Sequence, residues 1–227
     1  MPIVYGSSIV PGATFVFDSM NPRSYSGSGT VCYDLISKAA GTMFNTAVDS
    51  ANGAIFFNGA NASIQFINTI NTKADFTVGV LIYPSRYSTN ESWFDTLGAS
   101  GGIRLATSGV SGPTGALELA IRSSNVSVAG PYTPNIYNAN TSWYYLVGTY
   151  NSSANVSYVY SNGVSVASKT AFFANAVGSS TANIFIGACA NPVFARGYLN
   201  FVHFYQRELN STEIAQNFQA LRLRVNL

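Results

Sequence analysis

Acidic residues are the first candidates for chemistry, because hydrolysis of a glycosidic bond needs two carboxylates about 5–9.5 Å apart. Glu91 and Asp95 are the closest pair on one strand-like segment, but extended chain would separate them by about 13 Å. Glu118 lies alone between Leu117 and Leu119 and should point away from their face. We therefore expect no enzymatic activity and no catalytic residues. Hydrolysis that depends on Glu118 or Asp95 is kept as an alternative.

Trp93, Asp95 and Arg104 flank a loop expected over Gly98–Gly102 and are candidate glycan-binding residues. An aromatic ring can stack on a sugar, while charged side chains hydrogen-bond to its hydroxyls. The other interpretation, which we favour, is that Trp93 packs in the core and the charged residues are solvated beside the loop. Trp143 opens a strongly apolar segment and is expected in the core.

The metal-ligating and nucleophilic residue types are sparse. His203 is the only histidine, and a position between Val202 and Phe204 predicts a surface or packing residue on the opposite face rather than a catalytic base. Cys32 and Cys189 lack the spacing of a metal site and are expected to be buried free thiols. We therefore expect no metal and no cofactor.

Charged residues make up only 9% of the 227-residue chain, against roughly 25% in a typical soluble domain. A polar but nearly uncharged surface loses little desolvation energy when neighbouring subunits or neutral sugars cover it. Compositional bias of the source genome is the alternative explanation. The net charge is +2 and the basic residues are scattered, which argues against a nucleic-acid partner.

The N-terminal residues 1–5 do not form a basic region followed by an apolar stretch, and no uncharged apolar run reaches about 18 residues. We therefore expect no signal peptide and no membrane span. The protein is expected to be made in a host cytoplasm and to leave it by cell lysis or by assembly into a particle.

Short alternating segments separated by turn residues predict an all-β protein. In Phe76–Pro84 the even-numbered residues are apolar, which predicts a strand buried at least on that face. Asn162-Gly163 predicts a type I′ turn in a hairpin over Tyr158–Val166. The other expected strands are Ala13–Asp18, Ala54–Phe57, Ser63–Phe66, Trp93–Leu97, Ala116–Arg122, Trp143–Tyr150, Ile184–Gly187 and Leu199–Tyr205.

One helix is expected, at about residues 211–222. Asn210 can cap it and Glu213 can reach back to the cap amide, while Ile214, Phe218 and Leu221 form an apolar stripe. No linker or internal repeat is visible. We expect an N-terminal arm at residues 1–12, which could serve as an anchor, and a single domain over residues 13–227.

Three segments of the chain are similar to a known group of modules. The segment Gly197–Leu209 ends in Tyr-x-Arg-x-Leu and precedes the capped helix with Glu213-Ile214. The other two are Phe57-Asn58-Gly59 and an opening with Asp18, Asn21-Pro22, Ser24-Tyr25, Gly27–Thr30 and Tyr33–Leu35. Together they resemble the laminin-G-like, concanavalin A-like lectin/glucanase modules of many tailed-phage virion proteins. The resemblance implies a jelly-roll β-sandwich of two antiparallel sheets with one short C-terminal helix.

The chain departs from that pattern at three positions. Leu81 stands where a Trp is frequent, and Asn58 and Asn200 stand where an Asp is common. Calcium prefers several oxygen ligands that include charged ones. The loss of these carboxylates therefore argues against a calcium site.

The resemblance implies a non-enzymatic virion structural protein, either a capsid decoration (cement) protein or a head or tail fibre module. Its expected partners are the major capsid protein or other virion subunits, with homo-oligomers and host surface glycans as further partners. The alternative is a soluble carbohydrate-binding module without a virion role, whose sugar affinity would fall when Trp93 or Arg104 becomes Ala.

Overall fold

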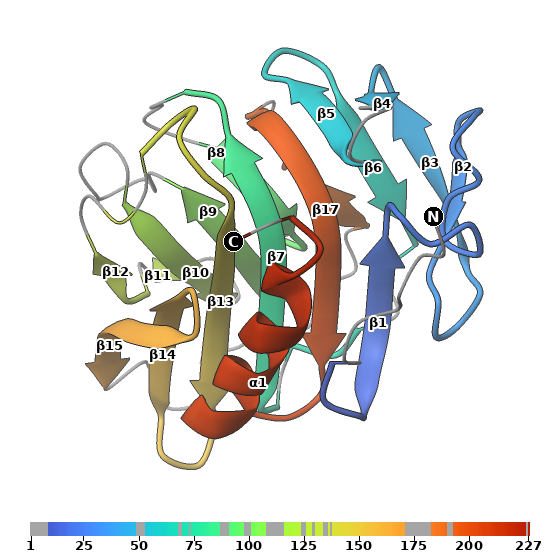
Figure 1. Ribbon diagram of the computed structural model, residues 1–227. Helices are drawn as coiled ribbons and strands as arrows, with labels where there is room; N and C mark the ends of the chain where they lie inside the picture. Colours follow the sequence, from blue (N-terminus) through green and yellow to red (C-terminus); the bar gives the residue numbers. More distant parts are fainter. Residues whose placement is uncertain are drawn as a thin grey trace.

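The computed structural model describes residues 9–48, 53–67, 70–72, 74–86, 91–97, 101–107, 116–123, 126–128, 130–133, 136, 138–170, 183–189, 193–225 and 227. Over these residues the chain forms a β-sandwich of two antiparallel sheets with one C-terminal helix (Figure 1). The predicted fold class is confirmed.

The first sheet, sheet A, lies toward the viewer in Figure 1, with the helix in front of it. Its strands follow the order β15-β14-β13-β7-β17-β5-β4, and β1 pairs with β17. Their bounds are β1 Ala13–Asp18, β4 Ala47–Val48, β5 Ile55–Asn58, β7 Phe76–Pro84, β13 Tyr144–Asn151, β14 Val156–Ser161, β15 Val164–Thr170 and β17 Arg196–Tyr205.

The second sheet, sheet B, follows the order β11-β10-β9-β8-β16-β6-β3-β2, and β12 pairs with β10. Its strands are β2 Val31–Tyr33, β3 Ala40–Phe44, β6 Ser63–Phe66, β8 Glu91–Asp95, β9 Gly101–Thr107, β10 Leu117–Ser123, β11 Val126–Val128, β12 Tyr132–Thr133 and β16 Ile184–Ile186. Strands that are distant in the sequence are thus neighbours in both sheets.

The core lies between the sheets and is filled by alternate residues of the strands. Phe76, Val78, Val80 and Ile82 of β7 have no exposed surface and belong to it. The sequence predicts burial of this face, and the opposite face is buried as well, because Leu81 belongs to a second apolar cluster beneath the helix. Cys32 and Cys189 are buried free thiols, as predicted.

The predicted hairpin joins β14 to β15. Asn162 and Gly163 have φ angles of 51° and 83°, as the type I′ turn requires. The Asn162 side-chain oxygen also accepts a hydrogen bond from the Tyr145 amide at 2.9 Å. The turn is therefore tied to the neighbouring strand β13.

Helix α1 runs from Ser211 to Arg222, where the sequence places it. The Asn210 side chain accepts from the Glu213 amide at 3.0 Å and Glu213 accepts from the Asn210 amide at 3.0 Å, which completes the predicted capping box. Ile214 and Leu221 pack in the second apolar cluster against Tyr145. The helix therefore covers part of the outer face of sheet A, as Figure 1 shows.

Several strands are missing from the sequence-based expectation. Strand β9 begins at Gly101, inside the segment Gly98–Gly102 that is expected to be a loop; residues 98–100 lie outside the described residues. The short strands β2, β3, β4, β11 and β12 are also unpredicted. They carry two to five residues each, too few for a clear alternating pattern.

Of the expected N-terminal arm, residues 1–8 lie outside the described residues. Val10 packs on the domain, where its amide donates to Asn217 Oδ1 at 2.7 Å and its carbonyl accepts from the Tyr205 hydroxyl at 2.6 Å. No helix in the described part of the chain is long and apolar enough to cross a membrane.

Replacing Asn210 by Ala is expected to lower the free energy of unfolding by about 1 kcal/mol, because the Glu213 amide loses its capping acceptor. Urea unfolding followed by circular dichroism measures the change. Gln219→Ala, on an exposed position of the same helix, is the matched control and should leave the free energy within about 0.5 kcal/mol of its original value. Equal effects of the two substitutions would contradict the role of the cap.

Candidate functional site

The three candidate glycan-binding residues do not form one group. Trp93 lies in the core with no exposed surface, where its Nε1 donates to the Thr107 hydroxyl at 2.8 Å. Its ring meets Phe57 edge to face at 6.4 Å. A register shift between Ser92 and Phe94 accompanies the placement of both Trp93 and Phe94 in the core. The indole therefore offers no face to a sugar.

Asp95 and Arg104 do lie side by side, because they are opposite each other on β8 and β9. Arg104 Nε donates to Asp95 Oδ2 at 2.6 Å, and Asp95 Oδ1 accepts from the Leu97 amide at 2.9 Å. The Asp95 side chain has no exposed surface and that of Arg104 is 12% exposed. Burial lowers the pKa of Arg104, but the Asp95 carboxylate more than offsets this and raises it. The two groups form a structural ion pair.

The two other candidate carboxylates are buried too. Glu118 is 2% exposed, and Glu91 has no exposed surface. Arg86 Nε donates to Glu91 Oε1 at 2.5 Å. Burial nevertheless raises the pKa of Glu91 from 4.5 to about 7, because the desolvation of the carboxylate outweighs the hydrogen bond and the charge of Arg86. Glu91, Asp95 and Glu118 are therefore all withdrawn from the surface.

His203 lies beneath α1 with no exposed surface. Its Nε2 is 2.6 Å from the Tyr145 hydroxyl, and its ring contacts those of Phe201 and Tyr205. Burial lowers the pKa of His203 to about 3, so the ring is neutral near pH 7. The predicted face is confirmed, and the histidine is a packing residue.

The calcium site considered from the sequence does not fit the residues present. The Asn58 side-chain oxygen accepts from the amides of Ala60, Asn61 and Ala62 at 2.9, 3.0 and 3.2 Å, so it closes a turn. Asn200 has no exposed surface. Within the described residues, no three His, Cys, Asp or Glu side chains gather in a group that could hold a metal ion.

A row of four aromatic rings crosses the outer face of sheet A. Phe56, Tyr198, Tyr83 and Trp143 come from β5, β17, β7 and the residue before β13, which are neighbours in the sheet. We call them the aromatic row. Tyr198 is opposite both Phe56 and Tyr83 in the strand register. The ring centroids are 5.0 Å apart for Phe56 and Tyr198, 6.2 Å for Tyr198 and Tyr83, and 5.9 Å for Tyr83 and Trp143.

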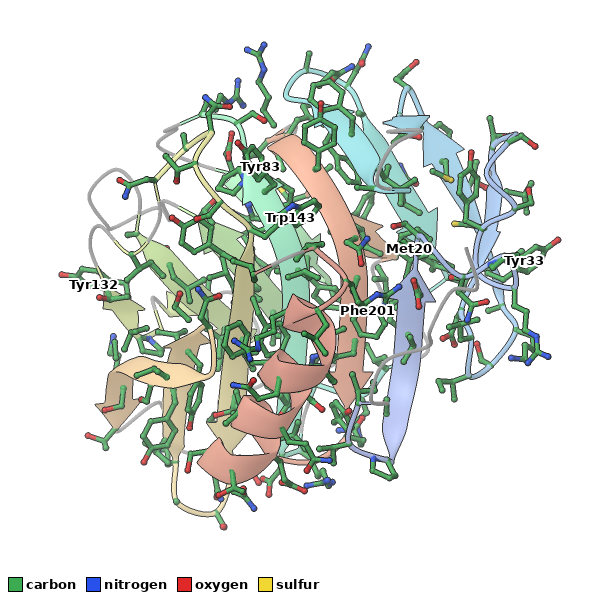
Figure 2. The ribbon with its side chains drawn as sticks, viewed as in Figure 1. Met20, Tyr33, Tyr83, Tyr132, Trp143 and Phe201 are labelled. Atoms are coloured by element: carbon green, nitrogen blue, oxygen red, sulfur yellow. The ribbon has the colours of Figure 1, made fainter. Side chains whose placement is uncertain are left out.

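Each ring of the aromatic row is partly exposed. The residues beside them along the strands, such as Ile55 and Leu199, belong to the core, so alternation directs the row outward. Figure 2 shows Tyr83 and Trp143 above α1, over a part of sheet A that the helix leaves uncovered. Aromatic faces with hydroxyl and indole N–H groups at their edges can stack on sugars and hydrogen-bond to them.

The sequence reasoning missed this row. It predicts Trp143 in the core, which is wrong, because the ring is partly exposed and packs beside the second apolar cluster. Tyr144 and Leu146 face the core. Trp143 precedes Tyr144 by one residue, so its side chain leaves the opposite face of the sheet. The same alternation, applied to Tyr83 and Tyr198, could have directed those rings outward. It could not have shown that their strands are neighbours.

The family model of the concanavalin A-like lectin/glucanases matches residues 57–215, which is more than half of the chain. The chain belongs to this superfamily. Its members share a fold that carries several activities, so membership does not define a ligand. No curated protein matches the chain closely enough in sequence to be counted as a relative.

Solved structures with a similar fold include domain 4 of the extracellular arabinanase AbnA from Geobacillus stearothermophilus, in complex with arabinotriose. The identity is 18% and the TM-score 0.69, with 92% of this chain and 100% of that domain covered. The binding domain of botulinum neurotoxin DC is 11% identical with a TM-score of 0.70, and the match covers 94% of this chain and 52% of that one. Trypanosoma rangeli sialidase is 15% identical with a TM-score of 0.64, and the match covers 96% of this chain and 34% of that one. The chain thus spans about half of the toxin domain and a third of the sialidase. At these identities the likeness establishes the fold alone.

The pKa of Glu91 predicts a pH dependence of stability. Between about pH 4.5 and pH 7 the folded protein holds a proton on Glu91 that the unfolded chain releases, so the free energy of unfolding should fall as the pH rises through this range. Glu91→Gln removes the ionisable group and should remove this part of the slope. Urea unfolding of both proteins at pH 5, 6, 7 and 8 measures it. A stability difference that stays constant with pH would refute the raised pKa.

Proposed function

We propose that this protein is a non-enzymatic carbohydrate-binding module that stacks sugar rings on the aromatic row. The observation that carries the proposal is the row itself, with Phe56, Tyr198, Tyr83 and Trp143 side by side and partly exposed. The spacing of neighbouring rings is similar to the length of one pyranose unit in an extended oligosaccharide. A chain of sugars lying across the strands could therefore contact several rings at once.

The non-enzymatic part of the proposal rests on the candidate carboxylates. Glu91 and Asp95 have no exposed surface, and each is paired with an arginine. Glu118 is nearly as buried. A glycosidase needs a raised-pKa acid and a second carboxylate that both reach the substrate. Glu91 has the raised pKa but lies beneath the surface, where it cannot reach a sugar.

We further propose that the module acts in a virus particle, as a decoration protein of the capsid or as part of a head or tail fibre, where it meets host surface glycans. The resemblance to tailed-phage modules and the 9% content of charged residues support this role. An apolar surface at the β2–β3 edge of sheet B also suits contact with a neighbouring subunit. It consists of Val31, Tyr33, Ile36 and Phe44, which are 41–49% exposed.

Replacing Trp143 or Tyr198 by Ala is expected to weaken glycan binding about tenfold, because each change removes one stacking surface. A glycan array identifies the ligand, and isothermal titration calorimetry of the best ligand measures the affinities. Tyr132→Ala is the matched control, since Tyr132 is a 47% exposed tyrosine on sheet B. Unchanged affinity in both row variants, or no binding of any glycan by the original protein, would refute the proposal.

Quantitative mass spectrometry of purified particles from the source culture tests the virion role. A copy number close to that of the major capsid protein would indicate decoration of the shell, and a small fraction of it would indicate a fibre or tail module. Absence of the protein from the particles would overturn the virion role and favour a soluble lectin instead.

A further inference from the structure

A positive charge lies beside the aromatic row, next to Tyr198. Arg196 is the first residue of β17, and Tyr198 follows it by two positions, so both side chains leave the strand on the same face. Arg196 is exposed. Its partner across the strands is Asn58, whose side-chain oxygen is already engaged with three backbone amides of its own turn. Arg196 therefore lies beside Tyr198 along β17, at the side of the row.

Arg196, like the exposed Arg23, belongs to no ion pair found among the described residues. The ion pairs found among the described residues engage Arg86, Arg104, Arg207 and Arg224. Arg196 is in none of these four pairs. In a chain with 9% charged residues, a cation that no carboxylate of the described residues pairs, beside four partly exposed rings, is available to a ligand.

A second guanidinium, that of Arg86, lies close to Arg196. A side chain at Gly59 would meet both the Arg196 Cβ and the Arg86 Nη1 at 2.9 Å, so the two arginines flank the same turn. Arg86 is held by Glu91 and by the Phe194 carbonyl at 3.0 Å. Arg86 is paired with Glu91, whereas Arg196 is in no ion pair among the described residues, so the surface around Gly59 carries a net positive charge.

We propose that the ligand is an acidic oligosaccharide, in which neutral faces of the sugars stack on the aromatic row and one carboxylate pairs with Arg196. The inference rests on the proposed glycan-binding function and names the class of sugar. A guanidinium and a carboxylate form charge-assisted hydrogen bonds in a fixed geometry. Arg196 would therefore fix the direction in which the oligosaccharide lies along the row.

A single-stranded nucleic acid is the other ligand that combines aromatic stacking with cations. It carries one phosphate for each stacked base, and binding would require cations along the whole row. Among the described residues, Arg196 supplies a cation next to one ring of the row, Tyr198. The charge distribution therefore favours an oligosaccharide with an isolated acidic group at the position of Arg196.

Isothermal titration calorimetry with xylotriose that carries one glucuronate side group, and with the methyl ester of that glucuronate, tests the proposal, because the two ligands share their sugars and differ at a single carboxylate. The original protein is expected to bind the acid about fivefold more tightly than the ester, a modest ratio because water screens the exposed guanidinium. Arg196→Gln should bring the ratio to about one, and Arg196→Lys should retain most of it. Arg23→Gln, at another exposed arginine, is the control and should keep the full ratio.

The outcomes separate this inference from the proposed function. Equal affinity of the original protein for acid and ester, or a ratio that survives in Arg196→Gln, overturns the role of Arg196 while glycan binding stands. If neither ligand binds, the same comparison with 3′-sialyllactose and lactose decides whether a terminal sialic acid replaces the uronic acid. Failure of both pairs overturns the acidic-glycan proposal. Binding of oligo-dT that is lost in Arg196→Gln would assign the row to nucleic acid.

Discussion

Strand β7 is buried on both faces, and the structure depends on covering both of them. Val78 and Val80 face sheet B, while Leu81 on the opposite face belongs to the cluster beneath α1. A sheet with one solvated face normally alternates apolar and polar residues, and β7 lacks such a polar face. Gly79 lies on the same face as Leu81 and leaves room for the buried His203 ring, which a side chain at this position would approach to 2.4 Å.

Helix α1 can cover this face because its N-terminal end is tied to the sheet. The Thr77 hydroxyl donates to the Arg207 carbonyl at 3.0 Å and accepts from the Leu209 amide at 2.8 Å, which fixes the chain just before the helix. Arg207 also pairs with Glu213 at 2.7 Å in the first turn. A helix of 12 residues spans only about 18 Å, so it leaves part of sheet A uncovered. The aromatic row occupies an uncovered part, where half-buried rings replace the apolar residues that the helix covers elsewhere.

Local patterns allowed the fold to be predicted, but not the site. Alternation and turn chemistry identify β7, the Asn162-Gly163 hairpin and the capped helix, because each signal lies within a few residues of sequence. The aromatic row depends on residues 56, 83, 143 and 198, which meet only through the strand order of sheet A. The same limit explains Trp143. The apolar segment that it opens predicts a core position, but the phase of β13 directs the ring outward, whereas Trp93 lies in the core, as the favoured interpretation expects.

A binding surface built on strands has an energetic consequence. Loops that close on a ligand lose conformational entropy, and this loss subtracts from the affinity. Tyr83 and Tyr198 are already held by register, by partial burial and by their contact at 6.2 Å, so little ordering remains when a ligand covers them. The scarcity of charged residues acts in the same direction, because few ions have to be desolvated. A rigid aromatic row with one cation beside it can therefore gain selectivity from a single charge, since the rings supply area and Arg196 supplies the distinction between acidic and neutral sugars.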